Sequence, residues 1–324
     1  MIGKLDPETL TRVLARTGAS NPAVLTGAAY GEDAAAIDLG TETLVVSTDP
    51  ISLAAEAAGT LGVHVACNDV AACGADPEFL TNVLFLPDDD PETIDTLTEQ
   101  LDAAAGEIDV AIVGGHSEYV SALSRPLLSL TAFGRTDRYI PTGGARPGDR
   151  LILTTGAAIE GTAIAATDFA DKLRDSGVEQ ATIDRAATFF DDISVLADSR
   201  ALRSVATAMH DPTEGGFVAG CVELASASGV DLVVDRAAIP TRPETDTICA
   251  ALALDPLRIF GSGALLATVR EDETEATLDA LEKAGIEGEI IGRAIESNAE
   301  GALVLDGERL TDPGTDELYP LWES

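Results

Sequence analysis

The chain has 324 residues, of which 45% are hydrophobic, so it is long enough for two domains and too apolar for a disordered acidic protein. Its 56 Asp and Glu residues against 20 Lys and Arg give a formal net charge of −36, and no basic stripe favours nucleic acid as a partner. Because the acids are spread over every segment, we interpret them as the solvated surface of a halophilic protein rather than as a site for a basic partner.

The sequence also indicates the compartment and the state of the cysteines. No stretch is long and apolar enough to span a membrane, and the amino terminus, MIGKLDPETL, has no features of a signal peptide. The four cysteines form no C-x-x-C pair, which gives a zinc or redox site little support. We therefore expect a cytoplasmic protein without a membrane partner, whose thiols are reduced and buried.

The first half of the chain predicts alternating helices and strands. The opening predicts a helix over about residues 7–17, with Asp6 as its N-cap and an apolar stripe that includes Val13. The next elements, in chain order, are a hairpin-like pair of strands at 34–38 and 44–47, a long Ala-rich helix at 56–72, a strand at 79–86, a helix from Pro91, and strands at 110–113 and 126–135. Together they predict an α+β domain.

The segment PTGGARPGD, residues 141–149, is the clearest domain boundary, because it holds two Pro and three Gly in nine residues. We therefore predict an N-terminal domain over 1–140, a linker over 141–149 and a C-terminal domain over 150–324. The elements predicted for the second half are a strand at 150–154, a helix from about 159, a polar helical region at 168–201, a helix ending at 228, a strand at 231–234, a helix from 244, a strand at 264–269, a helix at 271–284, and strands near 288–295 and 302–305.

Four short strings in the first 120 residues carry most of the chemistry. GED (31–33), STD (47–49) and ND (68–69) supply carboxylates near the ends of predicted elements, and GGHSE (114–118) follows an apolar strand as a predicted turn. Carboxylates at strand ends are suited to Mg²⁺, which prefers oxygen ligands and can neutralise phosphate oxygens. Taken singly, each Asp is as well explained as a helix cap or turn residue. The set together favours a metal–nucleotide site.

The amino-acid sequences of several longer segments, and their order along the chain, resemble those of the aminoimidazole ribonucleotide (AIR) synthetase superfamily, also called PurM-like. The resemblance spans nearly the whole chain. It is carried by STDPISLAAEAAGTLGVHVACNDVAACGADPEFLTNVLFLP (47–87), TGGARPGDRLILTTGAAIEGTAI (142–164), HDPTEGG (210–216) and LALDPLRIFGSGALLATV (252–269). Among the branches of the superfamily, DPTEGG and LALDPLRI are most similar to the hydrogenase-maturation type.

This resemblance implies a two-domain α+β fold. In the superfamily, N-terminal domains pair into a β-barrel shared by a homodimer, and the C-terminal domain is an α/β sandwich. The resemblance also implies ATP and Mg²⁺ as cofactors and a small-molecule substrate. It assigns the metal to Asp33, Asp49 and Asp69. Nucleotide binding is assigned to those three residues together with Asn68, Gly114, Gly115 and His116. A lone His is more often structural than a ligand, so a direct metal role for His116 stays open.

In the second half, the resemblance places Asp211 and Glu160 beside the acceptor substrate. The pair Gly215–Gly216 allows a tight turn into a helix whose N-terminal N–H groups could meet an anion. An Asp N-cap followed by a glycine turn explains HDPTEGG about as well when the string is considered alone. No Walker A loop is present, so carboxylate–metal bridges would hold the nucleotide.

The sequence departs from the characterised branches at the acceptor side. It ends LYPLWES, without the terminal cysteine of the hydrogenase-maturation branch, and it lacks the acidic residues that the thiamine-monophosphate kinase branch carries near residues 261–263. The leading hypothesis is an ATP- and Mg²⁺-dependent enzyme that activates an amide or carboxyl oxygen of an unknown substrate by phosphoryl transfer. The alternatives are a small-molecule kinase and a nucleotide-binding regulator without turnover.

Overall fold

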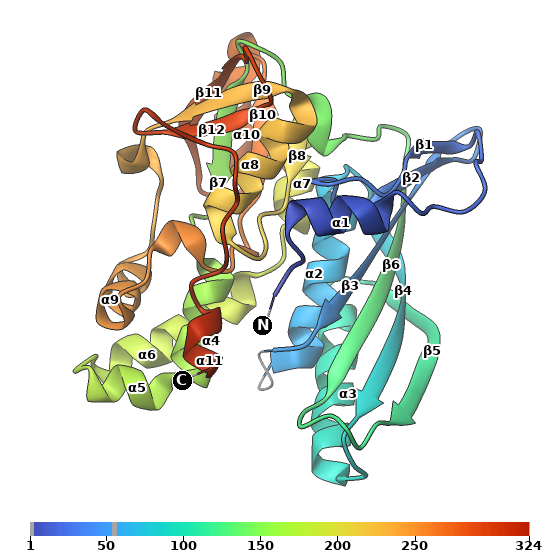
Figure 1. The fold of residues 1–324 in the computed structure, drawn as a ribbon, viewed down its shortest axis with the longest axis vertical. Coiled ribbons are helices and arrows are strands. Elements are labelled where there is room, and N and C mark those ends of the chain that lie inside the picture. Colours follow the sequence, from blue (N-terminus) through green and yellow to red (C-terminus); the bar gives the residue numbers. More distant parts are fainter. Residues whose placement is uncertain (1–2, 54–56, 324) are drawn as a thin grey trace.

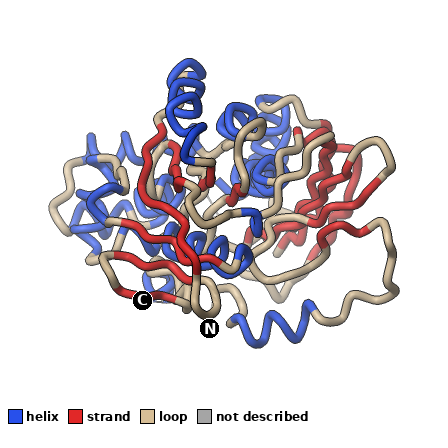
Figure 2. The backbone as a smooth tube through the Cα atoms, turned by 90° about the horizontal axis from the view of Figure 1, so that it is seen from above, coloured by secondary structure: helices blue, strands red, loops and turns tan. Residues whose placement is uncertain are grey.

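The computed structural model describes residues 3–53 and 57–323, and its chain forms two mixed sheets, each covered by helices. The strands of the first sheet all precede residue 137, and those of the second all follow residue 149. Seen from above, the strands form two separate groups (Figure 2). The α+β class predicted from sequence is therefore confirmed, with one sheet in each half of the chain.

The N-terminal sheet has six strands in the order β1-β2-β3-β6-β4-β5 (Figure 1). All neighbours are antiparallel except β4 and β5, which run parallel. The strands are β1 (Val24–Thr26), β2 (Ala35–Asp38), β3 (Thr43–Ile51), β4 (Asp76–Leu86), β5 (Ala111–Tyr119) and β6 (Leu127–Thr136). The predicted hairpin is the β2–β3 pair, in which Ala36 faces Val45.

Three helices belong to this half: α1 (Pro7–Leu14), α2 (Ala58–Ala72) and α3 (Pro91–Glu107). Asp6 caps α1 as predicted, since its carboxylate accepts a hydrogen bond from the N–H of Thr9 (2.9 Å). The expected apolar stripe of α1 is only partly covered: Leu10 and Leu14 are half-buried, whereas Val13 is 55% exposed. Helix α2 is buried on all sides and packs between the sheet and α3. Glu56, the expected start of α2, lies outside the described residues.

Two of the acidic strings lie within strands rather than at their ends. β3 continues through STD because it stays paired with β6, so that Asp49 faces Leu130. β5 continues through GGHSE because it pairs with β4, so the predicted Gly-Gly turn is wrong. A Cβ on Gly115 would lie 1.8 Å from the carbonyl oxygen of Asn82, so close packing of the two strands requires glycine there.

The C-terminal sheet has seven strands in the order β13-β12-β9-β11-β7-β10-β8, antiparallel except for the β12–β9 pair. The strands are β7 (Arg150–Thr154), β8 (Ala208–His210), β9 (Val230–Val234), β10 (Leu266–Val269), β11 (Gly288–Glu296), β12 (Ala302–Leu305) and β13 (Glu308–Leu310). The helices are α4 (Ile159–Asp168), α5 (Ala170–Asp175), α6 (Gln180–Ala187), α7 (Leu196–Leu202), α8 (Gly216–Ser228), α9 (Pro243–Leu252), α10 (Thr274–Ala284) and α11 (Tyr319–Glu323). The short elements β8, β13 and α11 were not predicted.

The two halves are tied together through α2 and the region around α7. The side-chain amide of Asn68 donates to the carbonyl of Ile193 (2.8 Å) and accepts from the N–H of Val195 (3.0 Å). At the outer end of this contact, Asp76 pairs with Arg200 and Arg203, each at 2.7 Å. These contacts cross between the sequence halves and hold the site described next between them.

Two expectations about composition can be compared with the structure. All four cysteines are free and buried, as predicted. Burial raises the pKa of Cys67, for example, to about 12, which keeps that thiol protonated. Among the residues that the structure describes, no helix combines the length and apolar character needed to cross a membrane.

Candidate functional site

A cavity of about 1250 Å³ lies between the two halves of the molecule, and the amino-terminal segment and α1 form part of its wall. Its walls come from the turn before β2, from β3 and α2, from the HDPTEGG segment and α8, and from residues 311–323. Small-molecule sites usually occupy about 300–1,000 Å³. This cavity therefore has room for a nucleotide and a second small molecule.

The centre of the cavity wall in the N-terminal half is a pair of carboxylates. Oγ of Ser47 donates to Oδ2 of Asp69 at 2.6 Å and lies 3.1 Å from Oδ2 of Asp49. Asp69 is buried, and burial together with the negative charge of Asp49 raises its pKa well above the usual range. The resemblance implied that these two acids, one on a strand and one on a helix, share a metal site, and the structure brings them together.

Asp33 lies close to that pair but makes a different contact. Its Oδ1 lies 2.6 Å from Nδ1 of His210, and Nε2 of the same imidazole lies 3.1 Å from Oε2 of Glu223. Burial alone would lower the pKa of His210, but Asp33 and Glu223 raise it to about 10. The imidazolium thus holds the GED turn of the first half against β8 and α8 of the second.

Lys4 covers the same acids from the amino-terminal side. Its Nζ lies 3.2 Å from Oγ1 of Thr213 and 3.7 Å from Oε1 of Glu223, and its backbone N–H donates to Glu214 (3.0 Å). Burial alone would lower the pKa of Lys4, but Glu223 and Glu214 raise it above its ordinary value. Together with His210, it partly neutralises a cavity whose other charged side chains are carboxylates among the described lining residues.

Asp211 lies in the wall of the cavity on the C-terminal side. The residue is only 1% exposed, and among the described residues its oxygens lack a well-formed hydrogen bond, with the side-chain amide of Asn68 as a nearby donor. Burial, followed by the negative charge of Asp33, raises the pKa of Asp211 well above its ordinary value. A buried, poorly hydrogen-bonded carboxyl group that faces a cavity is suited to exchanging a proton with a bound substrate.

Glu160, the second predicted acceptor-side residue, does not line the cavity. It occupies the first turn of α4, where its N–H donates to the carbonyl of Ser262 (3.1 Å), and its side chain is buried. Burial raises the pKa of Glu160 to about 7. Its charge also raises the pKa of Asp211, so Glu160 would influence a substrate through that residue.

The buried Glu160 predicts a specific pH dependence. Because its pKa rises from 4.5 to about 7 on folding, the folded state holds the proton more tightly, and stability falls as pH rises from about 4.5 to 7. Glu160→Gln removes this titration, so the variant should gain stability over the wild type at pH 8 relative to pH 5, by about 3 kcal/mol at most. Urea unfolding at both pH values measures this. An equal difference at pH 5 and pH 8 would contradict it.

The glycine turn before α8 already receives an anion from within the chain. Gly215 and Gly216 have φ angles of 77° and 62°, and a Cβ on Gly216 would lie 2.3 Å from the carbonyl oxygen of Ile259. The N–H of Gly215 donates to Oδ2 of Asp316 (2.9 Å), and burial raises the pKa of Asp316 to about 7. The acceptor at this helix end is therefore a carboxyl group from the carboxy-terminal segment.

The remaining predicted nucleotide ligands lie outside this cavity in the described chain. Both ends of the Asn68 amide are used in the contacts with Ile193 and Val195, which favours a structural role for it. Gly114, Gly115 and His116 lie on β5, the exposed edge strand of the sheet. His116 lies 3.4 Å from Glu118 on the same strand. A single chain therefore does not bring this string to the acidic cavity.

The donor set fits a magnesium ion that is shared with phosphate oxygens. Among the described residues, no three His, Cys, Asp or Glu side chains are arranged to hold a metal alone. Mg²⁺ in nucleotide enzymes is usually held by one or two carboxylates together with substrate phosphates. Asp49 and Asp69 supply two such carboxylates, whose mutual repulsion a divalent cation would relieve. Asp33, engaged with His210, lies close enough for its charge to act on Asp69.

Three functional candidates were missed from the sequence: Lys4, His210 and Glu223. His210 directly precedes Asp211 in the HDPTEGG string, so its place beside the predicted acceptor residue was a usable signal. Lys4 is one of only three lysines, which was a weaker signal. Glu223 is one acid among 56, and nothing in the sequence distinguished it from the others.

Comparison with known proteins gives matches over most of the chain. Residues 31–136 match the AIR synthase related protein N-terminal domain, and residues 146–304 match the C-terminal domain of the same family. Carbamoyl dehydratase HypE of Cupriavidus necator is 32% identical over 274 residues, which cover 79% of this chain and 70% of the relative.

Two solved structures are similar to this chain over most of its length. The hydrogenase maturation protein HypE in complex with ATP has a TM-score of 0.73 and 25% identity, covering 93% of this chain and 91% of that one. AaThiL complexed with AMPPCP and TMP has a TM-score of 0.72 and 21% identity, covering 89% and 91%. The second likeness shows the fold alone.

Proposed function

Because this chain belongs to the AIR synthase related family, with HypE proteins among its relatives, we propose that it is an enzyme that uses Mg·ATP to phosphorylate an oxygen of a small-molecule substrate. That oxygen would belong to an amide or carboxyl group, which phosphorylation converts into a leaving group. The observation that carries the proposal is the convergence of Asp49 and Asp69 through Ser47 at the wall of the large interdomain cavity.

Each residue of the site takes a role that its contacts support. Asp49 and Asp69 would hold Mg²⁺, which when bound neutralises phosphate charge and orients the transferred group. His210 fixes Asp33 beside that pair through the 2.6 Å contact. Asp211, buried and poorly hydrogen-bonded, would accept or deliver the proton of the substrate group. Glu160 raises the pKa of Asp211 from behind the cavity wall.

Measurement of ADP release with and without candidate acceptors tests this function. We expect Mg²⁺-dependent ADP release that increases when an amide- or carboxyl-bearing acceptor is present, with the phosphate then found free in solution. A stable phosphorylated product would instead identify a kinase. Tight ATP binding without turnover would identify a regulator.

We further propose that the chain forms a homodimer through the N-terminal sheet. Helices α2 and α3 cover one face of this sheet, while the opposite face carries half-buried or exposed apolar side chains, including Phe79, Phe85 and Phe133. The edge strand β5 is exposed along its whole length, with Tyr119 63% exposed. Such apolar faces and long unpaired edges usually mark an interface. Pairing here would also bury the Gly114–His116 string at the contact between subunits.

Light scattering in molar KCl should therefore show a dimer for the wild type. Phe79→Asp should give a monomer with an unchanged fold, since Phe79 is 44% exposed and the introduced charge would be buried only by pairing. Leu39→Asp, which changes an exposed side chain near the β2–β3 turn, should remain a dimer and serves as the control. A monomeric wild type would contradict the proposed interface.

A further inference from the structure

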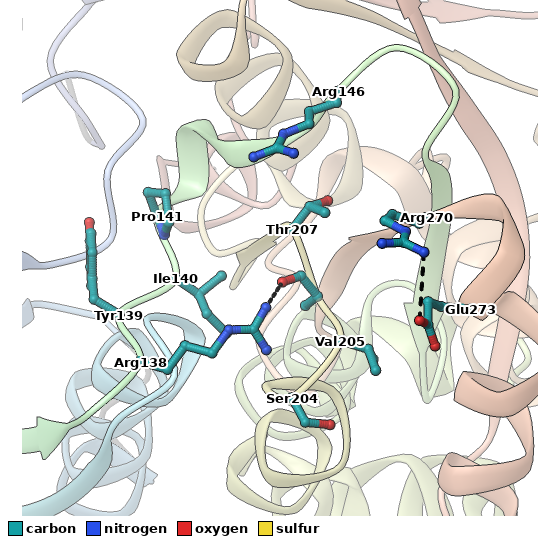
Figure 3. Close-up of a pocket in the computed structure, with 11 residues that line it drawn as sticks. Arg138, Tyr139, Ile140, Pro141, Arg146, Ser204, Val205, Thr207, Arg270 and Glu273 are labelled. Carbon is teal, nitrogen blue, oxygen red and sulfur yellow. Dashed lines mark hydrogen bonds and ion pairs between the residues drawn. The ribbon is translucent and has the colours of Figure 1, made fainter.

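A second cavity, of about 350 Å³, lies at the junction of the two halves and shares no lining residue with the acidic cavity. Three segments form its wall: residues 138–146, between β6 and β7; residues 204–207, between α7 and β8; and the turn after β10. Figure 3 shows three arginines around a central space, together with Ser204 and Thr207. Arg138 and Arg146 come from the segment between β6 and β7, and Arg270 comes from the turn after β10.

The charge of this cavity is opposite to that of the chain. Acids outnumber basic residues 56 to 20 in the whole sequence, whereas the lining contains three arginines and a single carboxylate, that of Glu273. An acidic surface does not explain why positively charged side chains from separate segments converge here. The cavity is therefore a local positive site on a strongly negative molecule.

Two of the three guanidinium groups lack a carboxylate partner in the described part of the chain. Arg138 donates to the backbone carbonyls of Arg203 (2.5 Å) and Ala206 (3.0 Å), which fix its position without neutralising it. Arg146 has no ion pair or side-chain hydrogen bond among the described residues, and Figure 3 shows its guanidinium above the cavity. Arg270 is paired with Asp272 and lies 3.8 Å from Glu273.

From this geometry we propose that the cavity binds the phosphate group of a small metabolite, which bridges the two halves of the molecule. Planar guanidinium groups recognise phosphate through paired charge-assisted hydrogen bonds, and the Ser204 hydroxyl offers a further donor. The volume of 350 Å³ lies at the lower end of the range for small-molecule sites, so the ligand is compact. Because Arg138 follows the N-terminal sheet and Arg270 lies in the C-terminal half, such a ligand would stabilise their relative position.

Titration of the full-length protein with inorganic phosphate, in EDTA and at constant ionic strength, tests the proposal. EDTA keeps phosphate from binding with Mg²⁺ at the acidic cavity. We expect saturable binding by calorimetry and a rise in melting temperature with phosphate concentration. Arg146→Gln and Arg270→Gln should each weaken this binding about tenfold, the usual effect of losing a hydrogen bond to a charged group.

Arg16→Gln is the matched control, since Arg16 is exposed and does not line this cavity, and it should bind phosphate like the wild type. Equal phosphate affinity in the wild type, Arg146→Gln and Arg270→Gln would overturn the proposal, as would the absence of saturable binding. Succinate, a dicarboxylate of similar charge, separates two ligand classes. Arginine-dependent binding of succinate but not of phosphate would overturn the assignment to phosphate.

Discussion

Replacing Asp49 or Asp69 by Asn should weaken Mg·ATP binding by about 100-fold or more. Each substitution keeps the size of the side chain but removes one negative charge from the pair that Ser47 joins. Loss of even an outer-shell partner of a metal ligand costs about 10- to 100-fold in metal affinity, so loss of a ligand's charge should cost at least that much. Calorimetric titration with Mg·ATP measures the change directly.

Folding should be affected much less than binding. Burial and the charge of Asp49 raise the pKa of Asp69, so folding disfavours its ionised form. A neutral Asn at position 69 should therefore leave the melting temperature unchanged or raise it. A variant that binds weakly because it is unfolded would be recognised by its melting curve.

The control for these variants has to be chosen from the structure. Asp90 is exposed but is the N-cap of α3, where it accepts hydrogen bonds from the N–H (3.1 Å) and hydroxyl (2.7 Å) of Thr93, so its replacement would also affect that helix. Asp89, in the same turn, is exposed and does not line the acidic cavity. Asp89→Asn should therefore bind Mg·ATP like the wild type. Equal affinity in all three variants would mean that Asp49 and Asp69 are not ligands.

Replacing Asp211 by Asn should reduce turnover by about 10²- to 10⁴-fold, the range that general acid–base catalysis usually contributes. Asn cannot exchange the proton that the buried, raised-pKa carboxyl of Asp211 is placed to exchange. Binding of Mg·ATP should change little, because Asp211 lies on the acceptor side of the cavity and is not one of the proposed metal ligands. ADP release with the best acceptor, measured alongside calorimetry, distinguishes the two effects.

Glu160→Gln is the comparison for Asp211→Asn. Glu160 is buried, does not line the cavity and raises the pKa of Asp211 through its charge, so its loss should shift the pH dependence of turnover more than its maximum. If both variants kept wild-type turnover at every pH, the acceptor role of this region would be wrong.

The sequence predicted the local elements well where the chain's own pattern decides them. Strand β7 (Arg150–Thr154) and strand β12 (Ala302–Leu305) occur at the predicted residues, and Asp6 caps α1. These local features depend on periodicity and caps. The convergence of Asp49 and Asp69 was implied by the resemblance to the AIR synthetase superfamily, which assigns both acids to one metal site.

The features that the sequence did not reveal depend on contacts between distant segments. The GGHSE string reads as a turn, yet pairing with β4 keeps it in a strand. His210 reaches Asp33 from 177 positions along the chain, and Asn68 bridges to Ile193 rather than facing a nucleotide. No local pattern determines which partner such a buried polar group finds, and only the assembled fold does.

Titration of the wild-type protein with ATP, once with Mg²⁺ and once with EDTA, tests the central claim most directly. If the Asp49–Asp69 pair holds a cation that bridges to the nucleotide, saturable binding should appear with Mg²⁺ and be lost in EDTA, since the carboxylates alone repel the phosphates. Identical ATP binding in Mg²⁺ and in EDTA, or no binding in either, would contradict the assignment of this cavity as a metal–nucleotide site.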